Sequence, residues 1–521
     1  LENFVYERST GRFDVGGKSD SALGSTIANG ELTLAAVNTI TAASFNVGFY
    51  GTSQSAHNTG TVHLGQTNEV NASTFLVGNQ KTTSLLDFQN LVNPTLKIRG
   101  TAGTNSSRAA ITVGINGSGI RAAVATIDLT SGGTVSSTLD AMVSTLLIGQ
   151  VLRDGSPGFS ATGSFLMGLG TLDATSIILG QQIAVTGANS SSDSIATLSL
   201  NGGTISASTF TLADKRSGAA AQTITSTFNL NSGVLKATTI QRGTAGTGAG
   251  ADSATIHFNW VDGTIGNIDG TNLTVRGNTA VNGLTGGLNI VLNDTGNVSG
   301  THTLEVSNSK TATFEDTVVL SGTGNLTKTG DGVLLFNGTS TSSGVVTVAE
   351  GTLGGSGIIS GDTSVSAGAT ITAGKIGTVN APISADLGTL QIAGNLTTPT
   401  GATWLVDLVQ GVSGSADRIE VGNHLDLSDS SLVVNFGGTF QANKVYTIAT
   451  YGSSLTGTFN GLNEGNFLGP GNLYFINYGS GPNGAITLTA VPEPGTLGLL
   501  GMAFGGYLFR RNWRKRARST T

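Results

Sequence analysis

The chain has no cysteine and few prolines or charged side chains for its 521 residues. The missing cysteines exclude disulfides, thiolate metal sites and cysteine nucleophiles. Proline occurs only 8 times and no G-X-Y period is present, which excludes a collagen-like triple helix. The net charge is −6 although the last dozen residues are rich in arginine. The body is therefore more acidic still, and we expect no nucleic-acid partner.

Glycine and alternating apolar residues are what the sequence has in abundance. Glycine occurs 78 times, and hydrophobic residues make up 38% of the chain. Much of the hydrophobic share is Val, Ile and Leu in alternating runs, and no window keeps a period of 3.6 residues. This pattern argues against disorder and predicts an all-β protein with many turns.

An internal repeat organises the first part of the chain. Short alternating segments end at Gly48, Gly78, Gly114, Gly149, Gly180, Ala213, Gly243 and Gly277. The successive spacings are 30, 36, 35, 31, 33, 30 and 34 residues. Repeats of this length with one buried face per strand predict a parallel β-helix, in which each coil stacks on the next. A β-propeller is the alternative, but its longer repeats and Trp-Asp marks are missing.

A second pattern begins near residue 284. The segment 322–361 carries Leu326, Lys328, Gly330, Gly332, Leu334, Gly338, Gly344, Val348, Gly351, Thr352 and Leu353 in order. With these residues it resembles the autotransporter-associated β-strand repeat, also called the passenger-associated transport repeat. The resemblance implies a right-handed parallel β-helix in a secreted or surface protein.

The stretch 388–462 looks like the end module that often follows those repeats, with "GATWLVDL", "ADRIEV" and "YTIATYGSSLTGTF" in order. A solenoid needs its last coil covered, so we expect a β-rich cap. The predicted organisation is β-helix repeats over 1–283, a continuation over 284–385, an end module over 386–490 and a tail over 491–518. The chain begins at Leu1 without an initiator Met or signal peptide, so we expect a longer N-terminus.

Enzymes that act on polysaccharides are the main rival interpretation, because they also use β-helices. Such enzymes need carboxylates that project together from adjacent coils. The nearest candidate, Asp417-Arg418-Ile419-Glu420, is explained as an ordinary strand by the end-module resemblance. The five histidines lie far apart, and each is expected to be solvated or on an edge strand. We therefore predict no enzyme activity, no metal and no cofactor.

The tail carries three elements in order. Pro492, Glu493 and Pro494 form a rigid Pro-Glu-Pro, and an uncharged apolar run follows over 495–509. The run is shorter than the ~20 residues of an untilted transmembrane helix, but flanking arginines can snorkel. Its anchoring side chains are Leu497, Leu499, Leu500, Phe504, Tyr507, Leu508 and Phe509. A basic stop then holds the C-terminus on the cytoplasmic side, through Arg510, Arg511, Arg514, Lys515, Arg516 and Arg518.

This order resembles the PEP-CTERM sorting signal. The resemblance implies processing by an exosortase, a membrane cysteine transpeptidase, after a transient stay in the inner membrane. The sequence thus predicts an exported structural or adhesive protein of the cell surface or extracellular matrix, with exopolysaccharide or neighbouring surface proteins as partners. Two alternatives stay open: a polysaccharide lyase or glycoside hydrolase, and the passenger of an autotransporter whose barrel is encoded elsewhere.

Overall fold

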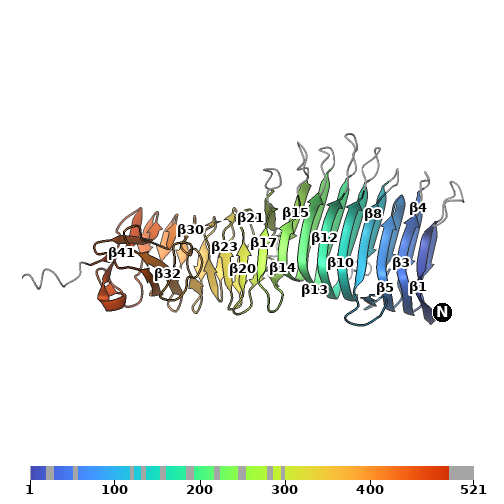
Figure 1. Cartoon of the computed structure of the whole chain (residues 1–521), viewed down its shortest axis with the longest axis horizontal. Helices are drawn as coiled ribbons and strands as arrows, with labels where there is room; N and C mark the ends of the chain where they lie inside the picture. The colour runs from blue at the N-terminus through green and yellow to red at the C-terminus, as the bar shows by residue number, and fades with distance from the viewer. Residues whose placement is uncertain are drawn as a thin grey trace, which may run out of the picture.

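A computed structural model describes residues 2–18, 29–50, 57–117, 122–130, 136–152, 160–183, 193–215, 223–244, 254–278, 286–294 and 300–491. Nearly all ordered segments in these ranges are strands, and their one helical turn is the 3₁₀ turn η2 (Pro470–Asn472). The strands stack side by side along one long axis (Figure 1). We call this stack the rod; its coils are broad from β1 to β15 and narrower from β17 onward.

The broad part of the rod holds most of the long strands. Their bounds are β1 (Asn3–Lys18), β2 (Gly30–Thr33), β3 (Val37–Tyr50), β4 (Asn58–His63), β5 (Thr67–Asn79), β6 (Thr82–Asp87), β7 (Thr95–Arg99), β8 (Ala109–Asn116), β9 (Ala123–Asp128), β10 (Thr138–Val151), β11 (Ala161–Met167), β12 (Leu169–Gln182), β13 (Ser194–Lys215), β14 (Ile224–Arg242) and β15 (Ala254–Trp260).

Shorter strands continue the stack and close it. They are β16 (Gly263–Asn267), β17 (Leu273–Arg276), β18 (Leu288–Leu292), β19 (His302–Glu305), β20 (Thr311–Phe314), β21 (Val318–Gly322), β22 (Leu326–Thr329), β23 (Val333–Phe336), β24 (Thr339–Ser340), β25 (Val346–Val348), β26 (Thr352–Gly354), β27 (Ile358–Ile359), β28 (Thr363–Val365), β29 (Thr370–Ile371), β30 (Thr389–Ile392), β31 (Leu396–Thr397), β32 (Thr403–Gln410), β33 (Ser415–Ala416), β34 (Arg418–Val421), β35 (His424–Asp426), β36 (Ser431–Gly438), β37 (Val445–Tyr451), β38 (Ser454–Thr456), β39 (Phe467–Leu468), β40 (Tyr474–Tyr478) and β41 (Gly484–Ala490).

Parallel pairing between successive coils produces the repeat seen in the sequence. β3 pairs with β5 and β12 pairs with β13 in parallel register, each about one sequence repeat apart. Most strands of the stack pair in parallel with the coil before and the coil after them, which is the pairing of a parallel solenoid. The all-β, parallel-rich fold predicted from the sequence is therefore confirmed.

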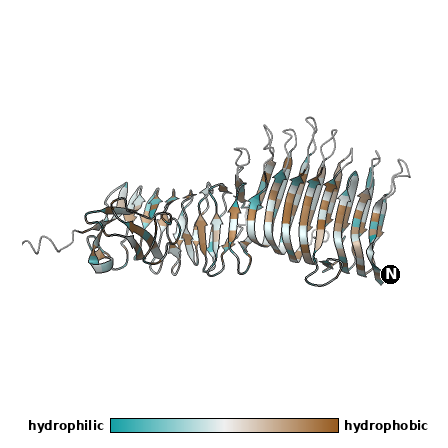
Figure 2. Ribbon diagram, viewed as in Figure 1, coloured by the Kyte–Doolittle hydropathy of each residue, from teal (hydrophilic) through white to brown (hydrophobic). Residues whose placement is uncertain are grey.

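One interior row of side chains runs through most of the rod. Phe13, Phe45 and Phe75 stack with ring centroids 5.3 and 4.7 Å apart. The same row ends in the narrow coils with Phe314 and Phe336. The register connects its members in the order Phe13, Phe45, Phe75, Ile111, Leu146, Ile177, Phe210, Ile240, Val275, Phe314 and Phe336. Hydrophobic and hydrophilic bands accordingly alternate along the long strands (Figure 2).

The glycines that mark the sequence repeat share one conformation. Gly48, Gly78, Gly114, Gly149 and Gly180 all have φ between 67° and 76° and occupy the same point of successive coils. This is the left-handed region, which glycine adopts without steric cost. The strands continue past these glycines in unbroken register, so each glycine marks a bend within a strand rather than the end of a strand.

Between Gly243 and Gly277, the register of the paired strands differs by one residue from the spacing of the glycines in the sequence. Gln241 pairs with Arg276, so Gly277 lies opposite Arg242 and not opposite Gly243. The sequence alignment matched one glycine to another, whereas the packing aligns the buried Ile240 with Val275. Register follows the buried row because a slip of one residue would expose it.

Antiparallel strands close the C-terminal end of the rod. β37 pairs antiparallel with β41, which also pairs antiparallel with β40. The aromatic cluster expected in this region forms here: Tyr474 packs against Phe436 with ring centroids 4.9 Å apart, and also contacts Phe440 and Tyr446. This layer covers the last parallel strands. The residue boundaries between the predicted domains stay predictions.

Candidate functional site

The predicted sorting signal follows directly after the rod. β41 ends at Ala490, and the backbone N–H of Val491 donates to the carbonyl of Leu473 at 2.9 Å. The Pro-Glu-Pro motif, the apolar anchor and the basic stop, residues 492–518, lie outside the described residues. Within the part that the structure describes, no helix is long and apolar enough to span a membrane.

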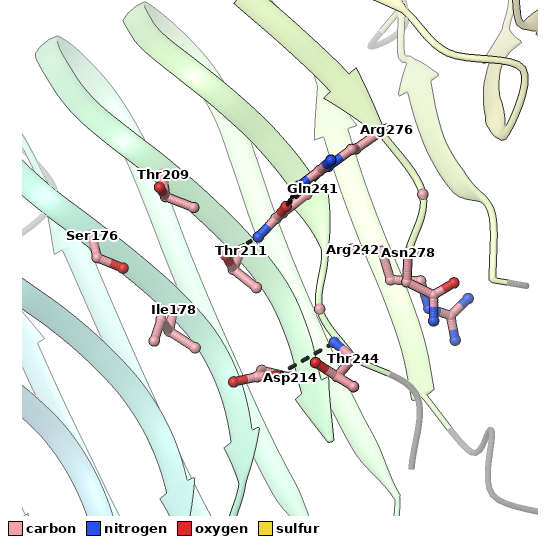
Figure 3. A pocket seen from close by; sticks show the side chains of 12 residues that line it. Ser176, Ile178, Thr209, Thr211, Asp214, Gln241, Arg242, Thr244, Arg276 and Asn278 are labelled. Atoms are coloured by element: carbon pink, nitrogen blue, oxygen red, sulfur yellow. Dashed lines mark hydrogen bonds between the residues drawn. The ribbon is translucent and has the colours of Figure 1, made fainter. Parts of the chain in front are cut away.

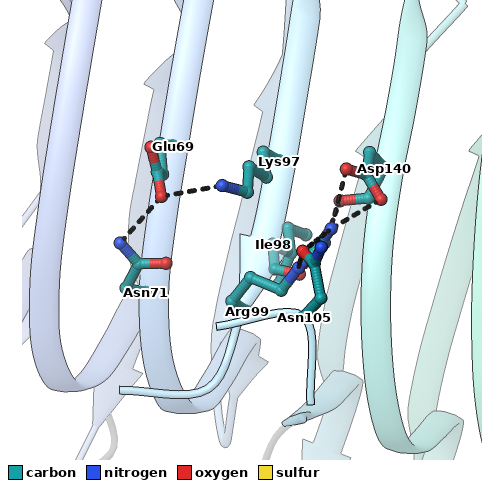
Figure 4. Close-up of polar contacts among 7 residues, drawn as sticks. All are labelled: Glu69, Asn71, Lys97, Ile98, Arg99, Asn105 and Asp140. Atoms are coloured by element: carbon teal, nitrogen blue, oxygen red, sulfur yellow. Dashed lines mark hydrogen bonds and ion pairs between the residues drawn. The ribbon is translucent and has the colours of Figure 1, made fainter. Parts of the chain in front are cut away.

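Several charged side chains on the broad coils form ion pairs between neighbouring strands. Figure 4 shows Arg99, which is 3% exposed, donating from Nη2 to both carboxylate oxygens of Asp140 at 2.9 and 2.7 Å. Lys97 forms an ion pair with Glu69 at 3.2 Å on the same face. Such bidentate and ladder pairs join neighbouring coils through charge-assisted hydrogen bonds.

Arg108 also joins neighbouring coils, through contacts with β10 and β12. Its Nη2 donates to Asp173 Oδ2 at 2.9 Å, and its Nη1 donates to the carbonyls of Val143 and Asp173, both at 2.9 Å. Together with Arg99 it fixes the excursion between β7 and β8, where the coil is longest. We interpret the role of both arginines as structural, because each connects strands of different coils.

One pair of carboxylates on adjacent coils does occur. Asp87 and Asp128 are register partners on β6 and β9, so their backbones are about 5 Å apart. They line a cavity of about 670 Å³ together with His63, Gln89, Asn90 and Leu91. Sequence reasoning missed this pair because the two residues are distant in the chain and carry no motif.

His63 is enclosed between carboxylates at the edge of that cavity. Its Nδ1 lies 2.6 Å from Asp87 Oδ1, and its Nε2 lies 3.4 Å from Glu31 Oε1. His63 is 9% exposed and His302 is 2% exposed, so the prediction of solvated or edge-strand positions is wrong for these two histidines. The burial of His302 is tolerated because its ring nitrogens have polar partners. They lie 2.9 Å from the carbonyl oxygens of Trp260 and Asn325.

A second carboxylate pair is buried in the end module. Asp407 and Asp417 are 0% and 1% exposed, and the backbone N–H of Asp407 donates to Asp417 Oδ2 at 3.1 Å. Burial raises the pKa of Asp417 to about 8, against the lowering effect of hydrogen bonds from the backbone of Gly388 and Asp407. The Asp417-Arg418-Ile419-Glu420 sequence therefore starts inside the protein and not in a cleft.

Lys328, one of the residues that carry the repeat resemblance, is also internal. It is fully buried, and its Nζ donates to the carbonyls of Thr329, Gly330 and Glu350 at 3.0, 2.6 and 3.0 Å. Burial lowers its pKa to about 8 although Glu350 and Asp331 act in the opposite direction. The ammonium joins the turns of two successive coils, so its position is structural.

A groove opens on the outer face where the broad coils end. It encloses about 420 Å³ and crosses β12, β13, β14 and the end of β17 (Figure 3). Hydroxyl and amide groups and two guanidinium groups dominate its lining. The residues are Ser176, Ile178, Thr209, Thr211, Asp214, Gln241, Arg242, Gly243, Thr244, Arg276, Gly277 and Asn278.

A chain of hydrogen bonds spans three coils in this groove. Arg276 donates from Nε and Nη2 to Gln241 Oε1 at 3.1 and 2.8 Å, and Gln241 Nε2 donates to Thr211 Oγ1 at 3.2 Å. Asp214 lies below this chain, where its carboxylate accepts from Gln181 Nε2 at 2.9 Å. No recognised motif marks these residues in the sequence, although "TIQRG" and "LTVRG" place a polar side chain at the same point of two repeats.

Among the described residues, no group of three or more histidines, aspartates and glutamates is arranged to hold a metal ion. The polar features found among the described residues are thus ion pairs between coils, buried carboxylates and polar cavities. The stack of parallel coils that carries them defines an all-β protein of the solenoid type.

The comparisons with known proteins assign the tail. The family described as the PEP-CTERM protein-sorting motif matches residues 490–515, which include the Pro-Glu-Pro, the apolar run and most of the arginines. The motif indicates an exported protein that is anchored in the membrane and sorted by an exosortase. No curated protein matches the chain.

Proposed function

We propose that the protein is a non-enzymatic structural or adhesive rod of the cell surface or extracellular matrix. The observation that carries the proposal is the long parallel stack, closed by antiparallel strands and followed by the sorting motif. The interior row of apolar side chains makes each coil depend on its neighbours and keeps the stack stiff. In this view the tail delivers the rod through the inner membrane, and the rod acts after delivery.

The outer faces of the coils support an adhesive role. Ser176, Thr209, Thr239 and Thr274 form one row of hydroxyls along β12, β13, β14 and β17. Amides form another row, in which Asn259 Nδ2 donates to Asn229 Oδ1 at 2.9 Å and Asn229 Nδ2 donates to Ser199 Oγ at 3.1 Å. Such rows suit contact with polysaccharide or with neighbouring rods through many weak polar interactions.

The proposal also includes the handedness of the coil and the family of one repeat. The coil is right-handed, and residues 322–361 are an autotransporter-associated repeat. The support for the second is the resemblance together with the shorter coils that begin there: Leu326 pairs with Val346, twenty residues on. Lys328 supports it as well, because a buried lysine that joins two turns gives a repeating unit a fixed spacing.

A second candidate, a polysaccharide-cleaving enzyme, is favoured by one observation. Asp87 and Asp128 stand on adjacent coils beside a cavity, and a retaining glycoside hydrolase also needs two carboxyl groups that project close together. Two contacts weigh against it. Asp87 is held by His63, and Asp128 Oδ1 accepts hydrogen bonds from the backbone N–H and the Oγ1 of Thr130 at 2.9 and 2.5 Å.

An activity assay separates the two candidates. The full chain is incubated with neutral and acidic polysaccharides, and new reducing ends and unsaturated products are measured. The non-enzymatic proposal predicts no release above buffer for the wild type. Release by the wild type that is lost in Asp87→Asn and Asp128→Asn, but kept in Asp173→Asn on the other face, would replace the structural proposal by the enzymatic one.

A further inference from the structure

The groove at the end of the broad coils has a cation whose partner is neutral. Arg276 is half-buried, and two of its N–H groups converge on the amide oxygen of Gln241. A guanidinium has five N–H donors, so three remain for another acceptor. Within the part of the chain that the structure describes, Arg276 has no carboxylate partner, whereas Arg99 and Arg108 each have one.

The described residues that line the groove beside Arg276 are mostly neutral and polar. Arg242 is a second guanidinium in this lining, and its Nη1 lies 3.4 Å from the carbonyl oxygen of Gly287. Among the described lining residues, Asp214 is the one acidic side chain, and it is 4% exposed with its carboxylate accepting from Gln181. The charge of Arg276 on an otherwise acidic chain therefore favours an anionic group by direct contact.

The shape of the groove suits a polymer more than a small ion. The row from Thr211 through Gln241 to Arg276 runs along the rod axis, with one residue contributed by each coil. Ser176 and Thr209 continue a parallel row of hydroxyls beside it (Figure 3). Successive coils are about 4.8 Å apart, so a chain laid along the axis meets a new set of donors at every coil.

We propose that this groove binds a carboxylate-bearing polysaccharide, with a uronate carboxylate on the free N–H edge of Arg276 and sugar hydroxyls on the neighbouring Ser and Thr rows. The inference rests on the proposed surface role, because an exported rod is what meets such a polymer. It adds to that role the chemical class of the ligand and the side chain that selects it.

The test is a titration of the full chain with oligogalacturonate by isothermal titration calorimetry. The wild type is expected to bind, and maltooligosaccharide of equal length is expected not to bind. Arg276→Gln should weaken oligogalacturonate binding at least about tenfold, because a charged hydrogen bond is lost. Arg276→Lys should fall between the two, since lysine keeps the charge without the planar fork.

Arg8→Gln is the matched control, because it removes the same charge from an exposed position at the far end of the rod. It should leave binding unchanged, and circular dichroism should show that all variants keep their strands. Equal binding by wild type, Arg276→Gln and Arg8→Gln would overturn the inference, as would no binding by the wild type or equal binding of dextran sulfate and oligogalacturonate. Each of these results leaves the proposal of a surface rod standing, because that proposal depends on delivery and not on this groove.

Discussion

Ala213 occupies a place that glycine holds in the coils before it. Its φ is 56°, close to the 73° of Gly180, its register neighbour. A side chain costs about 1–2 kcal/mol in this region, because Cβ crowds the following carbonyl oxygen. One alanine in the row is tolerated, since the surrounding coils fix the backbone on both sides.

We predict that Ala213→Gly raises the stability of its coil by about 1 kcal/mol, measured as a higher denaturation midpoint or slower hydrogen exchange. Gly149→Ala should destabilise by more than that amount. Its new Cβ would lie 2.6 Å from the carbonyl oxygen of Ile195, in addition to the strain of φ 67°.

Gly270→Ala is the control for this pair. Gly270 has φ of 80°, but a Cβ there would meet nothing within 4 Å, so only the backbone strain is tested. It should cost less than Gly149→Ala. If Gly149→Ala proved as stable as the wild type, the bend at the repeat glycines would not be the close approach that we describe.

At the scale of elements, the excursion between β29 and β30 is fastened to the buried aspartates of the end module. Asp407 Oδ2 accepts from the backbone N–H of Gly377 at 2.6 Å, and Asn435 Nδ2 donates to Asp407 Oδ1 at 2.6 Å. Asp417 Oδ1 accepts from the backbone N–H of Gly388 at 2.9 Å. These carboxylates therefore hold the ends of one loop to β32 and β34.

This arrangement predicts a pH dependence with a definite sign. The pKa of Asp417 is about 8 in the folded protein and about 3.8 when it is unfolded, so between these values the folded state binds the extra proton. Stability of the end module should fall as pH rises from about 4 to about 8. The change is measured as the denaturation midpoint across that range, and Asp417→Asn should flatten it. A wild-type midpoint that rises with pH over this window would show that Asp417 is ionised in the fold.

The sequence predicted the elements better than their contacts. Alternation and the spacing of glycines indicated stacked strands, because both follow from local backbone geometry and burial. The pairing of Asp87 with Asp128 and the groove at Arg276 depend on register between coils, which shifts where repeats differ in length. The burial of His302 was equally hidden, because its partners come from other coils.

At the scale of the whole molecule, the rod and the tail carry separate information. The rod has a continuous core from Phe13 to the antiparallel strands at its C-terminal end, and that core supports a stiff object. The tail matches a sorting motif and begins where the last strand ends. The strands of the described core lie before Val491, whereas the matched motif covers residues 490–515.

Mass spectrometry of the mature C-terminus, on protein collected from the surface of the native host, tests the central claim most directly. The account predicts a C-terminal peptide that ends near Pro492, Glu493 and Pro494 and lacks the arginines from Arg510 to Arg518. Surface protein that still carries those arginines would contradict exosortase sorting.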